Sequence, residues 1–254
     1  MAVNRKPLQG LKNVVQFNWH FYLLSGLSIA GLVLLSTYLE GVFQSLLLMI
    51  TVCIASSTMI SLIATVYIYD LSSLYEFRWL SSHKVADRAK ILNINAGFDE
   101  TSTLLSHRYP NATLLIADFY DPTFHTEVSI KRARKAYPPH PDTFSVKTDA
   151  LPYENDEFDM IFVTFAAHEV RDPEERLAFF RELLRVVKPQ ARIFVTEHLR
   201  DLRNFLVYTI GFMHFYSRSS WLQLFRDANL ELIQEVKTTP FVSTFILSKY
   251  GNSD

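Results

Sequence analysis

The sequence predicts a doubly wound, mostly parallel α/β sheet preceded by a transmembrane α-helical hairpin. Two long uncharged runs stand near the start, and strand-like and helix-like patterns alternate from Lys84 onward. The segment Ile91–Asp118 predicts a strand, a glycine-containing turn, a helix and a second strand that ends in a carboxylate. Such a turn lets the backbone approach a ligand, and the acidic residue accepts hydrogen bonds from ribose hydroxyls. We therefore expect an adenosine-type cofactor.

The composition excludes several classes of protein. The 254 residues leave room for one α/β domain and an appendage. A formal net charge of −1 gives no electrostatic basis for binding nucleic acid. The single cysteine, Cys53, excludes an intramolecular disulfide and a multi-cysteine metal site. It lies in an apolar run, so we expect a small buried hydrophobic residue.

The two uncharged runs are Phe21–Leu39 and Gly41–Tyr69. Each reaches the roughly 20 residues that a helix needs to cross a bilayer. A polar segment precedes the first run and the second follows closely, which favours a hairpin with its turn at Glu40 and Gly41 over a signal peptide. The alternative is a buried hairpin of a soluble bundle. Small residues would let the two helices approach: Gly26, Ala30, Ala55, Ser56, Ser57, Ser61 and Ala64.

Basic residues flank the runs on their outer sides and are missing from the turn. They are Arg5, Lys6 and Lys12 before the first run, and Arg78, Lys84, Arg88 and Lys90 after the second. The positive-inside rule predicts an integral membrane protein with both termini and the C-terminal domain in the cytoplasm. We expect a tail and two transmembrane helices over residues 1–70, an amphipathic linker over 71–83 and a cytoplasmic domain over 84–254. The aromatic residues of Leu71–Leu80 suit an interfacial helix, or a first helix that packs on the sheet.

The cytoplasmic half is expected to contain strands separated by helices. The expected strands are Ile91–Ile94, Thr113–Ala117, Phe144–Val146, Phe158–Phe165, Arg192–Thr196, Leu230–Lys237 and Phe241–Ser248, the last two as an antiparallel pair. The expected helices are Glu100–His107, Ile130–Ala136, Pro173–Val187 and Trp221–Ala228. Thr101 or Asp99 is expected to cap the first of these helices.

Five features in this order resemble the class I S-adenosylmethionine-dependent methyltransferases, especially the group with the quinone C-methyltransferases. They are ILNINAGF, the strand end IAD at Asp118, TDALPYENDEFDMIF from Thr148, the helix ERLAFFRELLRVVKPQARIFVTEH and a terminal β pair. The Lys188-Pro189 turn before the fifth strand is also typical. The resemblance covers Lys84–Lys249 and implies a seven-stranded Rossmann-like methyltransferase sheet with S-adenosyl-L-methionine as cofactor.

The resemblance also implies roles for individual residues. Residues of the first turn would line the methionine end of the cofactor, the end of the second strand would hold the ribose, and the segment after the third strand would meet the adenine edge. A residue after the fourth strand would border the sulfonium. In chain order the expected cofactor-binding residues are Asn93, Asn95, Ala96, Gly97, Asp99, Asp118, Phe119, Asp149, Ala150 and Phe165.

The turn departs from the family's usual Asp-x-Gly-x-Gly-x-Gly. Only Gly97 remains, Asn93 replaces the acidic residue, and Asn95 tolerates the positive φ that the turn requires. Asp99, at the third glycine position, would cap the following helix or bind the ammonium group of methionine. Complete loss of cofactor binding is the alternative.

Polar pairs follow the fourth and fifth strands, where ligands of parallel sheets bind. The expected catalytic residues are His168, Glu169, Glu197, His198, His214 and Tyr216, with His125 and Glu127 nearby. A histidine would deprotonate a phenol or enol before methyl transfer. The alternatives are a salt-bridged network and a divalent metal site. No metal is predicted, because adjacent residues on an extended chain point apart.

Two further segments suit a membrane surface. Asn204–Tyr216 carries Leu206, Val207, Ile210, Phe212, Met213 and Phe215, which predict an apolar wall of a substrate lid, a membrane-dipping surface or core packing. Asp121–Asp142 carries Lys131, Arg132, Arg134 and Lys135, which predict a solvated face or contact with an anionic headgroup.

These features predict a membrane-anchored methyltransferase that acts on a hydrophobic, membrane-resident acceptor such as a quinone, a phenolic lipid or a lipid headgroup. Its expected partners are the bilayer and this small molecule; the sequence indicates neither the acceptor atom nor the oligomeric state. One alternative is a metal-using, non-methylating enzyme of quinone modification, since rhodoquinone-forming enzymes also resemble quinone methyltransferases and have altered loops. Another is a non-catalytic membrane scaffold with the methyltransferase fold.

Overall fold

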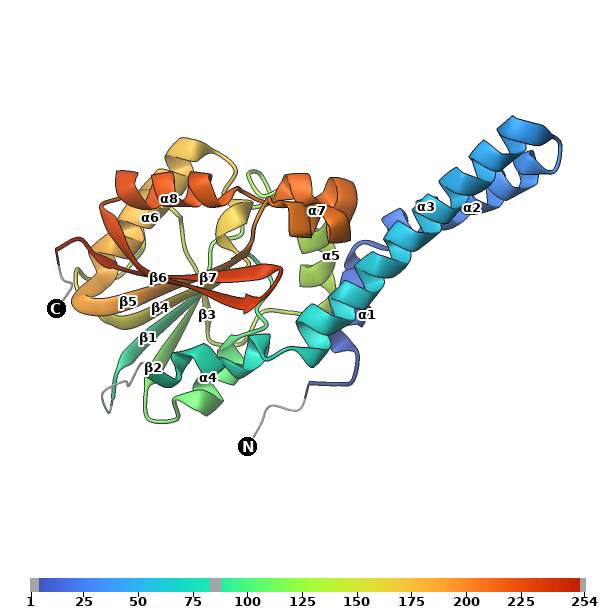
Figure 1. Cartoon of the computed structure of the whole chain (residues 1–254). Coiled ribbons are helices and arrows are strands. Elements are labelled where there is room, and N and C mark those ends of the chain that lie inside the picture. Colours follow the sequence, from blue (N-terminus) through green and yellow to red (C-terminus); the bar gives the residue numbers. More distant parts are fainter. Residues whose placement is uncertain (1–4, 83–87, 252–254) are drawn as a thin grey trace.

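The computed structural model describes residues 5–82 and 88–251. A helical hairpin projects as a rod from an α/β domain (Figure 1). The expected boundary between linker and domain, at residues 83 and 84, lies outside the described residues.

The described residues of the α/β domain form a seven-stranded sheet in the order β3-β2-β1-β4-β5-β7-β6. All neighbouring pairs are parallel except β5 with β7 and β6 with β7. This order confirms the doubly wound sheet with an antiparallel closing pair. The strands are β1 (Lys90–Asn95), β2 (Thr113–Asp118), β3 (Thr143–Ser145), β4 (Phe158–Thr164), β5 (Val187–His198), β6 (Leu230–Thr239) and β7 (Val242–Lys249).

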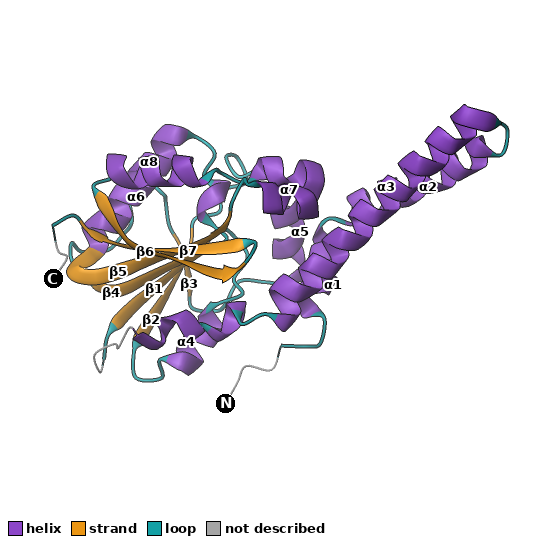
Figure 2. Cartoon of the chain, in the orientation of Figure 1, coloured by secondary structure: helices purple, strands orange, loops and turns teal. Residues whose placement is uncertain are grey.

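Helices cover both faces of the sheet (Figure 2). The α-helices of the domain are α4 (Ser102–Arg108), α5 (Val128–Ala136), α6 (Pro173–Val186), α7 (Leu202–Tyr208) and α8 (Arg218–Asp227). The segment Asn204–Tyr216 falls on α7 and on a 3-10 helix, Thr209–His214. The sequence placed a turn at Lys188 and Pro189, but both belong to β5, which begins at Val187 beside Phe158.

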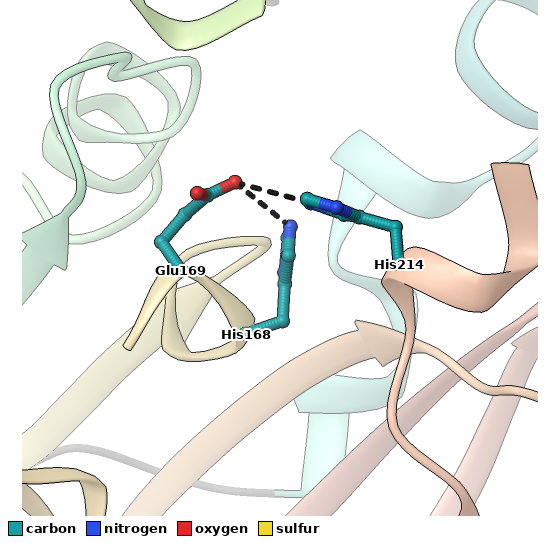
Figure 3. Close-up of side chains that lie close together, drawn as sticks. All are labelled: His168, Glu169 and His214. Atoms are coloured by element: carbon teal, nitrogen blue, oxygen red, sulfur yellow. Dashed lines mark ion pairs between the residues drawn. The ribbon is translucent and has the colours of Figure 1, made fainter. Parts of the chain in front are cut away.

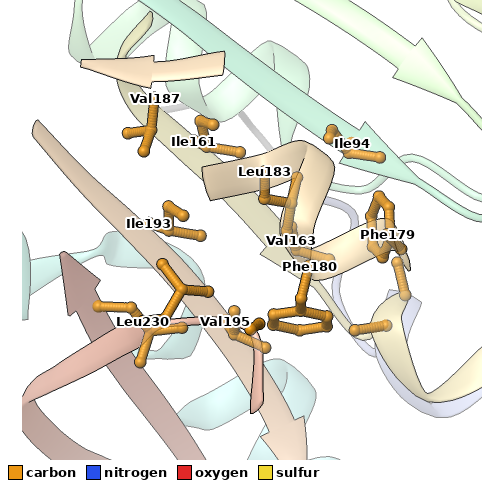
Figure 4. Close-up of a cluster of buried hydrophobic side chains, with 14 of the residues drawn as sticks. Ile94, Ile161, Val163, Phe179, Phe180, Leu183, Val187, Ile193, Val195 and Leu230 are labelled. Atoms are coloured by element: carbon orange, nitrogen blue, oxygen red, sulfur yellow. The ribbon is translucent and has the colours of Figure 1, made fainter. Parts of the chain in front are cut away.

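The central strands are buried on both faces, as their continuous apolar runs require. On one face Ile161, Val163 and Ile193 pack with Phe180 and Leu183 of α6 (Figure 4). On the other face Phe162 and Phe194 stack with their ring centroids 4.9 Å apart. This alternation follows from the period of two in a strand. Because β1, β2, β4 and β5 run parallel, their carboxyl ends lie at one edge of the sheet.

The hairpin consists of α2 (Trp19–Ser36) and α3 (Gly41–Val66), which continues as a π-helical turn over Tyr67–Leu71. Both helices are long and apolar enough to cross a bilayer. Ser25 and Thr58 share a hydrogen bond of 2.9 Å between the helices, in the region where small residues let them approach. Cys53 is exposed on α3, so the expectation of a buried cysteine is wrong.

An additional helix, α1 (Gln9–Phe17), precedes the hairpin and was not expected from the sequence. Asp70, after α3, accepts hydrogen bonds from the amides of Gly10 and Leu11 at 2.7 and 2.9 Å, so it satisfies free donors of the first turn of α1. A Cβ on Gly10 would lie 2.3 Å from the Cβ of Tyr69, so only glycine permits this approach. Helix α1 therefore lies across the base of the hairpin and against α5.

The linker after the hairpin forms two 3-10 helices, Leu74–Glu76 and Arg78–Ser82. Phe77 and Leu80 are buried against β1 and β4 together with Trp79, which packs on Phe194. These aromatic side chains lie on the sheet, as in the alternative of a packed first helix, and not in a headgroup layer. Among the described large apolar residues of the linker, only Leu71 is exposed, at 74%.

Candidate functional site

The turn after β1 is stabilised by its own polar side chains. The Oδ1 atom of Asp99 accepts hydrogen bonds from the amides of Thr101 and Ser102 at 3.0 and 2.9 Å, which confirms Asp99 as the cap of α4. Asn93 is buried and donates to Thr101 and Ser102 at 2.9 and 2.7 Å, so it holds the turn and does not face a ligand. The Oδ1 atom of Asn95 accepts from the amide of Gly97, whose φ is +95°.

Arg134 of α5 crosses this turn. Its guanidinium pairs with Asp118 at the end of β2 and lies over the ring of Tyr120, 4.5 Å from the centroid. A Cβ on Gly97 would lie 2.8 Å from the Cδ atom of Arg134. The second carboxylate oxygen of Asp118 accepts from the amide of Tyr120 at 2.9 Å. Both oxygens expected to meet a ribose are thus engaged within the chain.

The residues of this region suit an adenosine-type cofactor, with Arg134 as the one obstacle. Asn95 has a buried Nδ2 atom without a hydrogen-bond partner among the described residues, so it offers a free donor. A cavity of about 40 Å³ lies beside Asn95, Ala96 and Phe165. That volume holds about one water molecule. The flexible side chain of Arg134 must leave Asp118 before a larger group enters.

The remaining expected cofactor residues lie apart from this turn. Phe119 is buried and packs against Phe179 and His125. Asp149 and Ala150 are exposed after β3, and neither lines the cavity beside Asn95. The structure therefore brings together Asn95, Gly97 and Asp118 and leaves the expected adenine-edge residues on the surface.

A second group of polar side chains follows β4 and β5. His168 and Glu169 lie on a 3-10 turn, Ala167–Glu169, and both are buried. The Nδ1 atom of His168 is 2.6 Å from Oε2 of Glu197, which is fully buried at the end of β5. The Nε2 atom of His168 lies 3.2 Å from Oε1 of Glu169 (Figure 3). His168 thus lies between two carboxylates.

His214, from the lid segment, completes this group. Its Nε2 atom lies 3.6 Å from Oε1 of Glu169, and its Nδ1 atom lies 3.1 Å from Oε1 of Glu127. Arg171 lies against the same ring and donates to the carbonyl of His214 at 2.7 Å. In the structure His168, Glu169, Glu197 and His214 lie together at one edge of the sheet, where the sequence analysis placed them.

Burial and the neighbouring charges set the protonation of this group. Burial lowers the pKa of His168, but Glu197 and Glu169 together raise it to about 10. Burial raises the pKa of Glu169, and His168 and His214 outweigh this effect and hold it well below its ordinary value. The hydrogen bond from His214 lowers the pKa of Glu127. At neutral pH His168 is therefore a cation between carboxylates and not a free base.

His198 is enclosed by aromatic rings and has both ring nitrogens occupied. It stacks between Phe165 and Phe215, with centroids 5.0 and 4.9 Å away. Its Nδ1 atom lies 3.0 Å from the carbonyl of Phe241, which only accepts, so Nδ1 donates and Nε2 accepts from the hydroxyl of Tyr69 at 2.7 Å. Burial, with the nearby His168, lowers the pKa of His198 to about 4. The expected general base is thus a neutral, hydrogen-bonded wall residue.

Tyr216 lies apart from the group. Its ring packs on Trp221 and under the guanidinium of Arg176, 4.0 Å from the centroid. Its hydroxyl is 3.4 Å from the carbonyl of Arg171, so it faces a loop and not a ligand. His125 also lies apart, with Nδ1 accepting from the amide of Asp121 at 2.9 Å.

A cavity of about 650 Å³ joins the two regions to the base of the hairpin. Its floor includes His168, Glu169, His198 and Phe165. Its far wall is formed by α1, α2 and α3, and its side by the lid; these contribute Phe17, Phe21, Tyr22, Ser57, Ser61, Tyr208 and His214. Cavities of this size accept drug-sized ligands.

Sequence reasoning missed three residues of this site. Tyr69 was placed at the end of the second expected transmembrane helix, and its hydroxyl donates to His198. Glu100 is partly buried and accepts from Tyr75 at 2.6 Å and from Asn13 of α1 at 3.4 Å. Burial raises its pKa, although Arg5 and these hydrogen bonds oppose the shift. Arg134 was assigned to a basic surface. The one sequence signal for a role of Tyr69 in the site is its polar hydroxyl at the end of an apolar run.

Part of the C-terminal domain is similar to a known protein family. The family model described as a methyltransferase domain matches residues 101–195. The match begins just after the altered turn. No curated protein matches the sequence.

Solved structures share the fold at low sequence identity. A SAM-dependent methyltransferase from Methanosarcina mazei is 15% identical over 68% of this chain and 97% of that chain, with a TM-score of 0.50. A SAM-dependent methyltransferase from Aquifex aeolicus is 16% identical over 75% of this chain and 97% of that chain, with a TM-score of 0.51. The C-terminal domain therefore has the fold of S-adenosylmethionine-dependent methyltransferases, and residues 101–195 within it match the methyltransferase domain model.

Proposed function

We propose that the protein is a membrane-anchored S-adenosylmethionine-dependent methyltransferase whose acceptor is a hydrophobic molecule of the bilayer, such as a quinone, a phenolic lipid or a lipid headgroup. The observation that carries the proposal is the cavity of about 650 Å³, because one of its walls is the hairpin itself. Ser25, Ser57 and Ser61 of the apolar helices line it together with His168 and Glu169 of the domain. A molecule that leaves the bilayer between α2 and α3 would reach the strand ends without crossing water.

The outer surface near the cavity supports the membrane anchor. Large apolar side chains of the hairpin are exposed along its whole length, including Phe21, Leu27, Leu34, Phe43, Val52 and Ile63. Burying such surface in lipid stabilises by about 25 cal/mol per Å², whereas water would leave it as an extended apolar patch. The basic flanks of the hairpin favour a cytoplasmic domain with both termini on the same side.

The lid supports contact with the same membrane. Leu202, Leu206 and Ile210 are 70%, 59% and 76% exposed, and α7 packs beside α3. Val207 is buried and Phe215 faces the cavity. One side of the lid thus forms the cavity wall, and the other side offers apolar contacts at the level where the hairpin leaves the domain.

The chain's own residues would divide the chemistry between the turn after β1 and the large cavity. Asn95, Gly97 and Asp118 would hold the cofactor, which supplies an electrophilic methyl group when bound. Phe165 and His198 would form the apolar wall at which the acceptor ring stacks. His168, Glu169 and His214 would hold the polar atom of the acceptor or its proton. Orientation in an enclosed cavity supplies much of the acceleration expected for such a transfer.

The first test is calorimetric titration of the detergent-purified protein with S-adenosylhomocysteine, followed by incubation with methyl-labelled S-adenosylmethionine and a membrane lipid extract. We expect binding in the micromolar range and label in the organic phase. Binding without label in any lipid would contradict the acceptor class and leave the cofactor assignment intact.

One observation favours the non-catalytic scaffold as a second candidate. Arg134 pairs with Asp118 and covers Gly97. Its guanidinium therefore fills the position that a cofactor would take, as expected of a domain that no longer binds one. If the wild type and the Arg134→Ala variant both fail to bind S-adenosylhomocysteine while they remain folded, the scaffold is the better account.

A further inference from the structure

The geometry points to a binding site for a divalent transition-metal ion, with His168, Glu169 and His214 as its ligands. One ligand atom from each of these side chains lies within 4.8 Å of the other two. The Oε1 atom of Glu169 is 3.2 Å from Nε2 of His168 and 3.6 Å from Nε2 of His214. Two ligands of one tetrahedral ion stand about 3.4 Å apart when each bond is about 2.1 Å. The longer distance exceeds a hydrogen bond, whereas it suits a shared ion.

The two imidazoles are oriented as metal ligands usually are. A carboxylate holds each Nδ1 atom, Glu197 on His168 at 2.6 Å and Glu127 on His214 at 3.1 Å. Both Nε2 atoms lie near Oε1 of Glu169. The guanidinium of Arg171 also lies within hydrogen-bond distance of both ring nitrogens of His214, so an ion at Nε2 would take the place of this cation. Such outer carboxylates fix the tautomer and the direction of a ligating histidine and are characteristic of metal sites.

Glu169 supplies an independent observation. Its side chain is 3% exposed, and its Oε2 atom has no hydrogen-bond partner within residues 5–82 and 88–251. A buried carboxylate oxygen without a partner loses its hydration without compensation, so a native protein rarely leaves one. An ion bound by Glu169 would satisfy it, because a carboxylate can coordinate through either or both oxygens.

The charges balance with a divalent ion. Glu127, Glu169 and Glu197 carry three negative charges, and Arg171 against His214 carries one positive charge. A bound ion would replace the proton that His168 carries in the metal-free protein, and with both imidazoles then neutral the group has a charge of −2. Two nitrogen ligands and one carboxylate favour zinc, manganese or iron over magnesium or calcium.

The ion would face the large cavity, because its three ligands line that cavity. Further coordination positions would be open to a ligand there, as in catalytic metal sites. If the proposed methyl transfer is correct, the ion would hold an oxygen of the acceptor and favour its deprotonated form. This last step rests on the proposed function, whereas the metal site itself does not.

The test measures metal directly. The protein is purified in detergent, stripped with a chelator, dialysed against Zn²⁺, Mn²⁺ or Co²⁺, and analysed by mass spectrometry of the metals. We expect about one ion per chain, and a visible Co²⁺ spectrum whose intensity reports the coordination. Glu169→Gln and His214→Gln should each lower affinity at least tenfold, and Glu127→Gln about tenfold through the orientation of His214.

The matched control is His107→Gln, which removes an exposed histidine of α4 and should leave the stoichiometry unchanged. Circular dichroism shows that each variant is folded, and His214 and Glu127 are exposed enough to be replaced if Glu169→Gln unfolds. The proposal is overturned if the folded wild type takes up none of the three ions, or if all ligand variants bind as the wild type does. Neither result depends on S-adenosylmethionine, so a failure of methyl transfer remains a separate finding.

Discussion

The two ends of the site differ in what fills them. At the turn after β1, the chain satisfies its own polar groups: Arg134 covers Gly97 and pairs with Asp118, and the cavity beside Asn95 is about 40 Å³. At the ends of β4 and β5, His168 and Glu169 line a cavity of about 650 Å³, and one oxygen of Glu169 has no partner among the described residues. The proposed acceptor end is thus open and has a carboxylate oxygen that no described residue pairs, whereas the proposed cofactor end is covered by the side chain of Arg134.

From this difference we predict that Arg134 controls access to the proposed cofactor end. An arginine side chain changes rotamer without unfolding its helix, so opening the cofactor end needs only the loss of one ion pair and one ring contact. The acceptor end is different, because its walls are α1, the hairpin and the lid. Four variants test the comparison, in order of decreasing effect.

Asp118→Ala should have the largest effect. Its carboxylate is the one group at the cofactor end placed for two ribose hydroxyls, and hydrogen bonds to a charged group contribute about 1.5–3 kcal/mol each. We expect the affinity for S-adenosylhomocysteine to fall about a hundredfold or more, measured by calorimetry. Asp142→Ala, whose side chain is 82% exposed, is the control. Unchanged affinity in Asp118→Ala would mean that the closed end is not the cofactor end.

His198 should make the acceptor end sensitive to acid. Its pKa is about 4 in the folded protein against 6.5 ordinarily, so only the unfolded chain takes up a proton as pH falls below 6.5. Stability is therefore lost between pH 6.5 and 4, by about 2 kcal/mol at pH 5. Urea unfolding in detergent at pH 7 and pH 5 measures it. His198→Asn should lose less on acidification; an equal loss in both proteins would assign the effect elsewhere.

Gly10→Ala should disturb the wall that α1 forms in the large cavity. The added Cβ would lie 2.3 Å from the Cβ of Tyr69, and relieving such a contact costs about 1–3 kcal/mol. We expect lower thermal stability and a looser large cavity, seen as faster hydrogen exchange in α1. Gly211→Ala is the matched control, because its nearest contact would be an ordinary 3.7 Å. Equal stability of the two variants would show that α1 is not held closely to Tyr69.

Arg134→Ala should have the smallest effect and the opposite sign. Removing the guanidinium frees Asp118 and the space over Gly97, and a half-exposed ion pair contributes about 1 kcal/mol or less. The affinity for S-adenosylhomocysteine should therefore rise about fivefold. Arg132→Ala, two residues away on α5, should not raise it. A loss of affinity in Arg134→Ala would mean that the side chain turns to bind the cofactor.

The sheet could be predicted because its determinants are local. The run Phe158–Phe165 is apolar except for Asp159 and Thr164, as is typical of a strand buried on both faces, and the antiparallel end pair follows the last helix directly. The position of Asp118 followed from the end of β2. The length of β5 could not be predicted, because Pro189 suggests a turn, yet the strand continues through it beside a bulge in its pairing with β4.

The sequence indicated most of the residues of the candidate site but not the contacts between them. His168 and Glu169 were expected to point apart on an extended chain, but they lie on a 3-10 turn and both reach His214. Arg134 closes the cofactor end because α5 folds back over the turn, which no local pattern indicates. Helix α1 is only nine residues long and lacks a side-chain cap of its own, so the sequence shows no start signal; Asp70 supplies the acceptors from far along the chain.

The hydrogen bonds from α1 to Asp70 couple the hairpin to α1, which forms one wall of the large cavity. Two amides of α1 are tied to the segment that ends α3, and each such bond to a carboxylate contributes about 1.5–3 kcal/mol. A change in the tilt of α3 must therefore carry α1 with it or break both bonds. Since α1 also reaches Glu100 through Asn13, we expect that, with the hairpin in a bilayer as proposed, the bilayer thickness, which affects helix tilt, also affects the shape of the large cavity.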